Sequence, residues 1–173
     1  MKKALLLLAL AIFIGGNASA QQAHRHAISM GPSELLGIAI NYEYMLFPNF
    51  SMAMEAGISA SLSLRAGYNA AIHARWFPVS NSAGRTLGFF VSGGLGFGGI
   101  WANEYYVEGV LLSTGVGYKV GAGKRKGFIF TPVLDINFVL GDKTPIGDYY
   151  NSGKTEFGFG WFPNLKVLFG IAF

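Results

Sequence analysis

Hydrophobic and polar residues alternate one by one over several stretches of this chain, and the last stretch is the clearest. Leu165, Val167, Phe169, Ile171 and Phe173 are large and apolar, whereas most residues between them are small or polar. A period of two is typical of a β-strand with one apolar face. A strand that ends the chain on an aromatic residue leaves an apolar edge uncovered. This favours a closed barrel in lipid over an open sheet in water.

The same alternation predicts eight strands in all. Their expected ranges are 26–30, 36–44, 52–62, 68–76, 87–98, 110–120, 128–138 and 163–173. Gly, Pro and polar residues separate the strands and predict turns at 47–49, 78–86 and 121–127 on one side and loops at 32–36, 62–67, 102–106 and 141–161 on the other. The fold class is therefore all-β, an eight-stranded antiparallel up-and-down transmembrane barrel. Its weakest part is strand 26–30, without which the terminal strand has no partner.

The start of the chain predicts export. Lys2 and Lys3 precede an apolar run at 4–14, and Ala18-Ser19-Ala20 forms a cleavage site, as in a secretory signal peptide. We therefore expect residues 1–20 to be removed and residues 21–173 to form one barrel domain. The apolar run is too short for a membrane-spanning helix, and no later run reaches eighteen apolar residues although 51% of the chain is hydrophobic.

Charge and cysteine content exclude several classes of protein. Without Lys2 and Lys3 the chain keeps 11 basic against 9 acidic residues, too small an excess to indicate nucleic acid as a partner. The chain has no cysteine, so neither a disulfide framework nor a lipoprotein anchor is expected.

The second face of the strands predicts a polar interior. Eight strands enclose a space that side chains fill, so inward charges need partners inside the barrel. The expected interior polar network is Asn41, Glu43, Glu55, His73, Arg75, Lys119, Asp135, Asn137 and Lys166. A turn centred near Arg65 would place Glu55 opposite Arg75, which predicts a salt bridge between them with Glu43 nearby. Inward glycines in strands 87–98 and 110–120 would leave room for long side chains.

Aromatic residues gather near the two ends of the predicted strands, as interfacial girdles do in membrane barrels. One expected girdle contains Tyr42, Tyr44, Phe47, Phe50, Trp76, Phe77, Tyr118, Phe128 and Phe173. The other contains Phe97, Trp101, Tyr105, Tyr106, Phe138, Phe159 and Trp161.

The Ala-Ser-Ala cleavage site, the alternating strands and the terminal Val-x-Phe-x-Ile-x-Phe together resemble the small outer-membrane β-barrels such as OmpX, OmpW and the barrel domain of OmpA. No loop motif of any member is matched. The resemblance implies a monomer in the outer membrane of a Gram-negative envelope, in contact with outer-membrane lipid and lipopolysaccharide. It also implies that the assembly machinery recognises Val167, Phe169, Ile171 and Phe173.

We expect a non-enzymatic protein that acts through its extracellular loops, in envelope integrity or surface interaction. The candidate contact residues are Asp142, Lys143, Asp148, Tyr149, Tyr150 and Lys154. A porin-like narrow channel, or a conduit for small hydrophobic molecules, is the alternative. A lipid A-modifying enzyme is disfavoured, because a deacylase of that kind needs a lipid-accessible Ser and His, whereas His73 is expected to face inward and the chain contains no His-x-Ser pair.

Other motifs have ordinary explanations. Gly94 to Gly99 matches the dinucleotide-binding glycine pattern but lies inside a strand, where no helix follows. His24 and His26 lack a third metal ligand, and Lys124-Arg125-Lys126 is typical of a solvated turn. We therefore expect neither a cofactor nor a metal ion.

Overall fold

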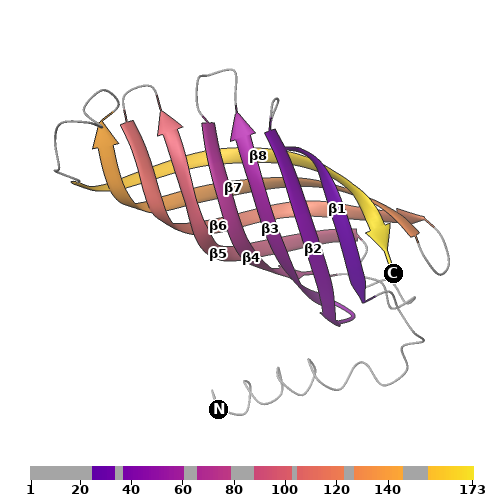
Figure 1. The fold of residues 1–173 in the computed structure, drawn as a ribbon. Helices are drawn as coiled ribbons and strands as arrows, with labels where there is room; N and C mark the ends of the chain where they lie inside the picture. Colours follow the sequence, from indigo (N-terminus) through magenta and orange to yellow (C-terminus); the bar gives the residue numbers. More distant parts are fainter. Residues whose placement is uncertain are drawn as a thin grey trace, which may run out of the picture.

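The structure is a computed structural model that describes residues 25–33, 37–60, 66–78, 88–102, 105–122, 127–145 and 156–173. These residues form eight antiparallel β-strands in a single closed barrel (Figure 1), which confirms the predicted strand number and all-β class. The strands are β1 His26–Ser33, β2 Gly37–Phe47, β3 Phe50–Ala60, β4 Ala66–Trp76, β5 Gly88–Ala102, β6 Tyr105–Ala122, β7 Gly127–Pro145 and β8 Glu156–Ala172. No helix among the described residues is long and apolar enough to cross a membrane. The expected signal peptide lies outside the described residues.

The barrel closes between its first and last strands. Ala27 to Met30 of β1 pair with Phe169 to Ala172 of β8, and the backbone amides of His26 and Phe173 each donate to the other residue's carbonyl oxygen. The start of β1 and the end of β8 therefore lie side by side, as the indigo and yellow ribbons show in Figure 1. The weakly patterned first strand is thus present and supplies the partner that β8 needs. We call the opposite end of the barrel, where β5 ends and β6 begins, the rim.

The register shows how steeply the strands are tilted. Starting from Ser29 on β1, one can step from each residue to its paired residue on the next strand, through β2 to β7. The last step reaches Gly160 on β8. The direct partner of Ser29 on β8 is instead Gly170, ten residues further along the strand. A shift of this size tilts eight strands by about 40° from the barrel axis and leaves an interior that side chains fill.

The second half of the barrel is taller than the sequence pattern predicted. Strands β5 to β8 contain 15 to 19 residues, whereas β1 to β4 contain 8 to 11. Residues expected in loops at 102–106 and 141–161 are largely strand residues, since Tyr105 to Gly109 pair with Gly141 to Pro145 and Glu156 to Gly160 pair with Val139 to Lys143. The expected bounds of these two loops were therefore too wide, because polar and glycine residues continue the hydrogen-bonded ladder at the rim; residues 103–104 and 146–155 lie outside the described residues.

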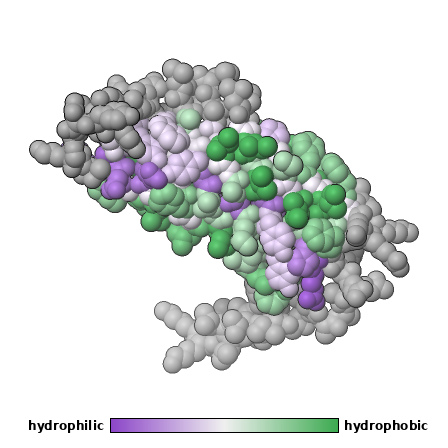
Figure 2. Space-filling view, viewed as in Figure 1, coloured by the Kyte–Doolittle hydropathy of each residue, from purple (hydrophilic) through white to green (hydrophobic). Residues whose placement is uncertain are grey.

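The outer wall of the barrel is apolar along the described strands. Thirty large hydrophobic side chains of the described residues are exposed, among them Ile40, Met54, Leu95, Leu134 and Leu165. Figure 2 shows hydrophobic residues spread over the wall on the face in view. The polarity of an ordinary water-soluble protein is therefore reversed over this surface.

Candidate functional site

The nine polar residues expected inside the barrel are all buried. Each has at most 4% of its surface exposed, although they come from six different strands. They alternate with outward apolar neighbours because successive side chains of a strand point to opposite faces. Their ionised groups form two separate ion-pair clusters, which we call the Glu43 cluster and the Lys166 cluster.

The Glu43 cluster joins one carboxylate to two cations. Arg75 Nη1 donates to Glu43 Oε2 at 2.6 Å, and Lys119 Nζ lies 2.9 Å from Glu43 Oε1. The Ser51 hydroxyl also donates to Glu43 Oε1 at 2.7 Å, and Arg75 Nη2 donates to the Asn41 amide oxygen at 3.0 Å. Hydrogen bonds therefore reach both oxygens of this buried carboxylate, which offsets the loss of its hydration.

The Lys166 cluster has the opposite stoichiometry, because one cation serves two carboxylates. Lys166 Nζ donates to Glu55 Oε1 at 2.5 Å and also pairs with Asp135 Oδ2. The Asn69 amide donates to Glu55 Oε1 at 3.0 Å. Lys166 therefore connects β8 to β3 and β7 across the interior.

The predicted salt bridge between Glu55 and Arg75 was wrong. Glu55 lies opposite Ala71 and Arg75 lies opposite Ser51, so the two side chains are four positions apart along β3 and β4. The pairing of β3 with β4 is symmetric about position 63, whereas the prediction had assumed position 65. Arg75 therefore pairs with Glu43, which had been expected only nearby, and Glu55 pairs with Lys166.

The two clusters compensate each other's charge. The Glu43 cluster carries one excess positive charge and the Lys166 cluster one excess negative charge, when each carboxylate, lysine and arginine is ionised. The three negative and three positive charges of the six groups therefore sum to zero. A neutral set of paired charges is what a water-poor interior can hold, since an unpaired ion there costs several kcal/mol.

One buried row contains polar atoms without a hydrogen-bond partner among the described residues. These atoms are His73 Nε2, Ser113 Oγ and both side-chain amide atoms of Asn137. The register places His73, Gly94, Ser113 and Asn137 directly beside one another on β4 to β7. Buried polar rows of this kind are satisfied by ordered water in many proteins.

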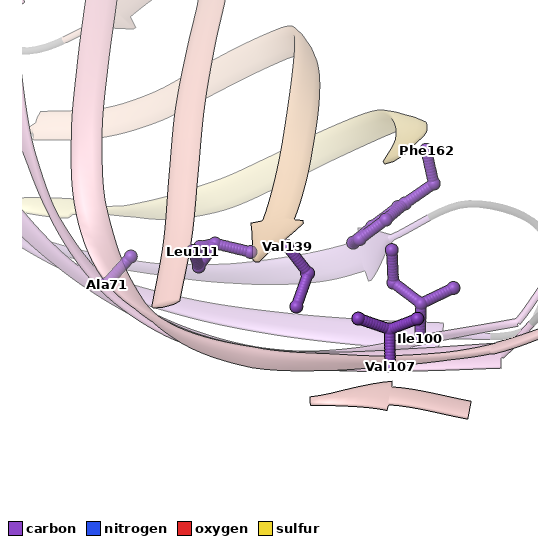
Figure 3. Close-up of a cluster of buried hydrophobic side chains, with 6 residues drawn as sticks. All are labelled: Ala71, Ile100, Val107, Leu111, Val139 and Phe162. Atoms are coloured by element: carbon purple, nitrogen blue, oxygen red, sulfur yellow. The ribbon is translucent and has the colours of Figure 1, made fainter. Parts of the chain in front are cut away.

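The interior also contains two apolar groups, so it is not polar throughout, contrary to the expectation from the sequence. Near the rim, six buried side chains form a cluster in which Phe162, Val139 and Ile100 point toward one another (Figure 3); its members are Ala71, Ile100, Val107, Leu111, Val139 and Phe162. Tyr105, expected in a girdle, packs against this cluster. We call it the apolar plug.

A second apolar group lies beside the Glu43 cluster and corrects the position of Phe77. This residue was expected in a girdle but is 0% exposed, with its ring 5.2 Å from that of Phe90. It follows the outward Trp76 and so points inward by alternation, and its backbone amide donates to the Asn49 carbonyl at 2.8 Å. The Arg75 guanidinium lies 5.1 Å from the centre of the Phe90 ring, a cation–π distance.

Inward glycines make room for this packing. A Cβ atom on Gly94 would lie 2.6 Å from His73 Nδ1, and one on Gly115 would collide with the Asp135 carboxylate. Both glycines lie on β5 or β6, where the sequence predicted such space. His73 and Asp135 can therefore lie flat across the neighbouring strand.

The terminal strand presents its predicted assembly residues on the outside. Phe169, Ile171 and Phe173 are exposed, and Val167 is half-buried. The His26 ring stacks on Phe173 with ring centres 5.7 Å apart, and His26 Nδ1 lies 2.7 Å from the Tyr42 hydroxyl. The chain end is thus held by the first two strands.

Only two of the six loop contact candidates lie among the described residues. Asp142 and Lys143 are strand residues of β7, and the Lys143 ammonium lies 4.7 Å from the centre of the Tyr105 ring. The other candidates, Asp148, Tyr149, Tyr150 and Lys154, lie outside the described residues.

A polar group on the outer wall was missed from the sequence. Near the rim, the hydroxyls of Tyr68 and Tyr106 donate to the two oxygens of Glu108 at 2.5 and 2.6 Å. The Trp101 ring lies 4.6 Å from the Tyr106 ring and 5.6 Å from the Tyr68 ring. We call these four residues the rim cluster. Tyr106 and Glu108 share a face by strand alternation, but Tyr68 and Trp101 join them only through the register of β4 to β6.

Comparison of the chain with protein-family models, with curated proteins and with solved structures finds no match.

Proposed function

We propose that this chain is an integral outer-membrane barrel protein without catalytic activity, which acts at its rim in envelope integrity or surface interaction. The observation that supports this most directly is the reversed polarity of the barrel: three acidic and three basic side chains are paired inside, whereas thirty large hydrophobic side chains face outward. In water, an apolar wall of this size would cause the protein to aggregate. In a bilayer, the same side chains would contact the lipid hydrocarbon.

The paired interior argues for a plug rather than a channel. A conducting path would have to pass the Glu43 cluster, the Lys166 cluster and the apolar plug, whose side chains are all buried. In planar bilayers we expect no steady single-channel current. Steady current altered by Arg75→Ala would instead support the narrow-channel alternative.

Insertion is tested by expressing the full chain, separating the outer membrane and comparing boiled with unboiled samples on a gel. A closed barrel resists detergent until heated, so we expect the unboiled band to migrate differently. Recovery of the protein in the soluble fraction, with one band under both conditions, would overturn the proposal.

The role of the loop is tested by a deletion confined to residues 146–155. Deleting Gly141 to Pro145 as well would remove strand residues that pair with Tyr105 to Gly109. We expect the shorter deletion to keep the heat-dependent band and to reduce adhesion or detergent resistance of cells. If both properties were unchanged, the loop would not carry the function.

A further inference from the structure

We infer that His73 makes the barrel sensitive to acid, because a proton on its ring adds a positive charge that the interior does not balance. This inference goes beyond the proposed role at the rim and concerns the inside of the barrel. His73 lies on the inward face of β4 and is 2% exposed. A histidine in water takes up a proton near pH 6.5, at about the acidity where cells and their surroundings vary.

The His73 ring has a fixed place but an incomplete set of hydrogen bonds. A Cβ atom on Gly94 would lie 2.6 Å from Nδ1 and 2.8 Å from Cε1 of this ring, so the ring lies over β5 where glycine leaves space. Its Nε2 atom is buried and has no hydrogen-bond partner among the described residues. A charged ring carries a proton on both nitrogens and needs an acceptor for each. A trapped water molecule can accept such a bond but brings no negative charge.

The charges around His73 cancel before it takes up a proton. Glu55 on β3 and Asp135 on β7 are negative, whereas Arg75 on β4 and Lys166 on β8 are positive, and all four interact electrostatically with His73. The residues directly opposite His73 on β3 and β5 are uncharged, and β5 contains no charged residue at all. A charged ring therefore meets as many cations as anions.

Both nearby carboxylates are already paired with the same cation. Lys166 contacts Glu55 through Oε1 and Asp135 through Oδ2. Glu55 Oε2 has no hydrogen-bond partner among the described residues, but a charged His73 that turned toward it would share Glu55 with Lys166. A proton on His73 thus changes the six paired charges from a neutral set to one with an unpaired positive charge. A water-poor interior disfavours such a charge.

The direction of the pH effect follows from the two states of the chain. Unfolding places His73 in water, where it takes up a proton below about pH 6.5 without this penalty. Acid therefore favours the unfolded state, since a proton that binds on unfolding draws the equilibrium toward unfolding. For one such proton, the unfolding equilibrium constant rises about tenfold between pH 7.5 and pH 5.5.

The test compares urea unfolding of the full mature chain in lipid vesicles at these two pH values. For the wild-type protein we expect an unfolding equilibrium constant about tenfold larger at pH 5.5, at one urea concentration within the transition. The double variant His24→Gln with His26→Gln leaves His73 as the only histidine of the chain and should keep this increase. His73→Gln stays uncharged and should reduce the increase to less than about twofold.

The double variant decides the question even where His73→Gln does not fold, because its histidine signal comes from one residue. In its ¹⁵N-histidine magnetic resonance spectrum at pH 5.5, we expect a neutral ring in the folded barrel. Three results would overturn the inference: an unchanged equilibrium constant in the double variant, an equal increase in His73→Gln, or a charged ring in the folded double variant at pH 5.5. An equilibrium constant that falls in acid would also overturn it, since a charged His73 would then strengthen the interior.

Discussion

At the scale of single residues, the interior depends on buried charges that pair with one another. Lys166 is the sole cation of its cluster among the described residues, and its side chain is 1% exposed. Removing its charge leaves Glu55 and Asp135 buried beside each other. Two carboxylates without a cation cannot both stay ionised at low cost in such a place.

We therefore expect Lys166→Met to lower the free energy of unfolding by about 3 to 5 kcal/mol. The measurement is urea unfolding of the barrel refolded in lipid vesicles. Lys143→Met is the matched control, because Lys143 lies at the rim over the Tyr105 ring, and its loss should cost about 1 kcal/mol or less. Equal effects of the two substitutions would show that the Lys166 cluster does not stabilise the interior.

Two glycines of neighbouring strands provide a test of the packing. A methyl group on Gly115 collides with Asp135, whereas one on Gly93 meets nothing within 4 Å. We expect Gly115→Ala to destabilise the barrel by about 1 to 3 kcal/mol, and Gly93→Ala to change stability by less than about 0.5 kcal/mol. The same unfolding assay measures both. A harmless Gly115→Ala would mean that Asp135 is not held against β6.

At the scale of elements, the barrel depends on the junction of β1 with β8. His26 stacks on Phe173 and reaches Tyr42, so one side chain links the first, second and last strands. This contact acts after closure, whereas the resemblance to small outer-membrane barrels assigns Phe173 a role before closure, in recognition by the assembly machinery.

Substitutions on the two sides of this stack should therefore have different effects. We expect Phe173→Ala to reduce the amount of protein in the outer membrane. His26→Ala should leave that amount near the wild-type level but lower the free energy of unfolding by about 1 to 2 kcal/mol, through loss of one ring stack and one hydrogen bond. Quantitative membrane fractionation and urea unfolding separate the two effects. Equal loss of membrane protein in both variants would contradict this division.

The strands also indicate what the sequence could predict. Alternation identified the face of the interior polar residues, so Glu43, Asp135 and Lys166 were correctly expected inside. It could not determine the register, because a shift by two or four residues keeps every side chain on its face. The partner of Glu55 was therefore wrong, since Lys166 is 111 residues away in sequence and meets it only through closure. The rim cluster was not predicted for the same reason, because its residues meet only through the register of β4 to β6.

At the scale of the whole molecule, a membrane barrel must contact lipid with its apolar wall. Along β8, the outward residues Phe157, Trp161 and Leu165 descend from the rim toward the middle of the wall, and all three are exposed. Since the native chain has no cysteine, a single cysteine at each position can carry a spin label without competing sites.

The most direct test is the depth of these labels in vesicles, measured by paramagnetic resonance with oxygen, which enters lipid, and a nickel chelate, which stays in water. We expect the ratio of oxygen to nickel collisions to rise in order from Phe157→Cys through Trp161→Cys to Leu165→Cys, because the hydrocarbon begins below the rim. Nickel collisions as frequent at Leu165→Cys as at Phe157→Cys would contradict this expectation, since the middle of the wall would then face water.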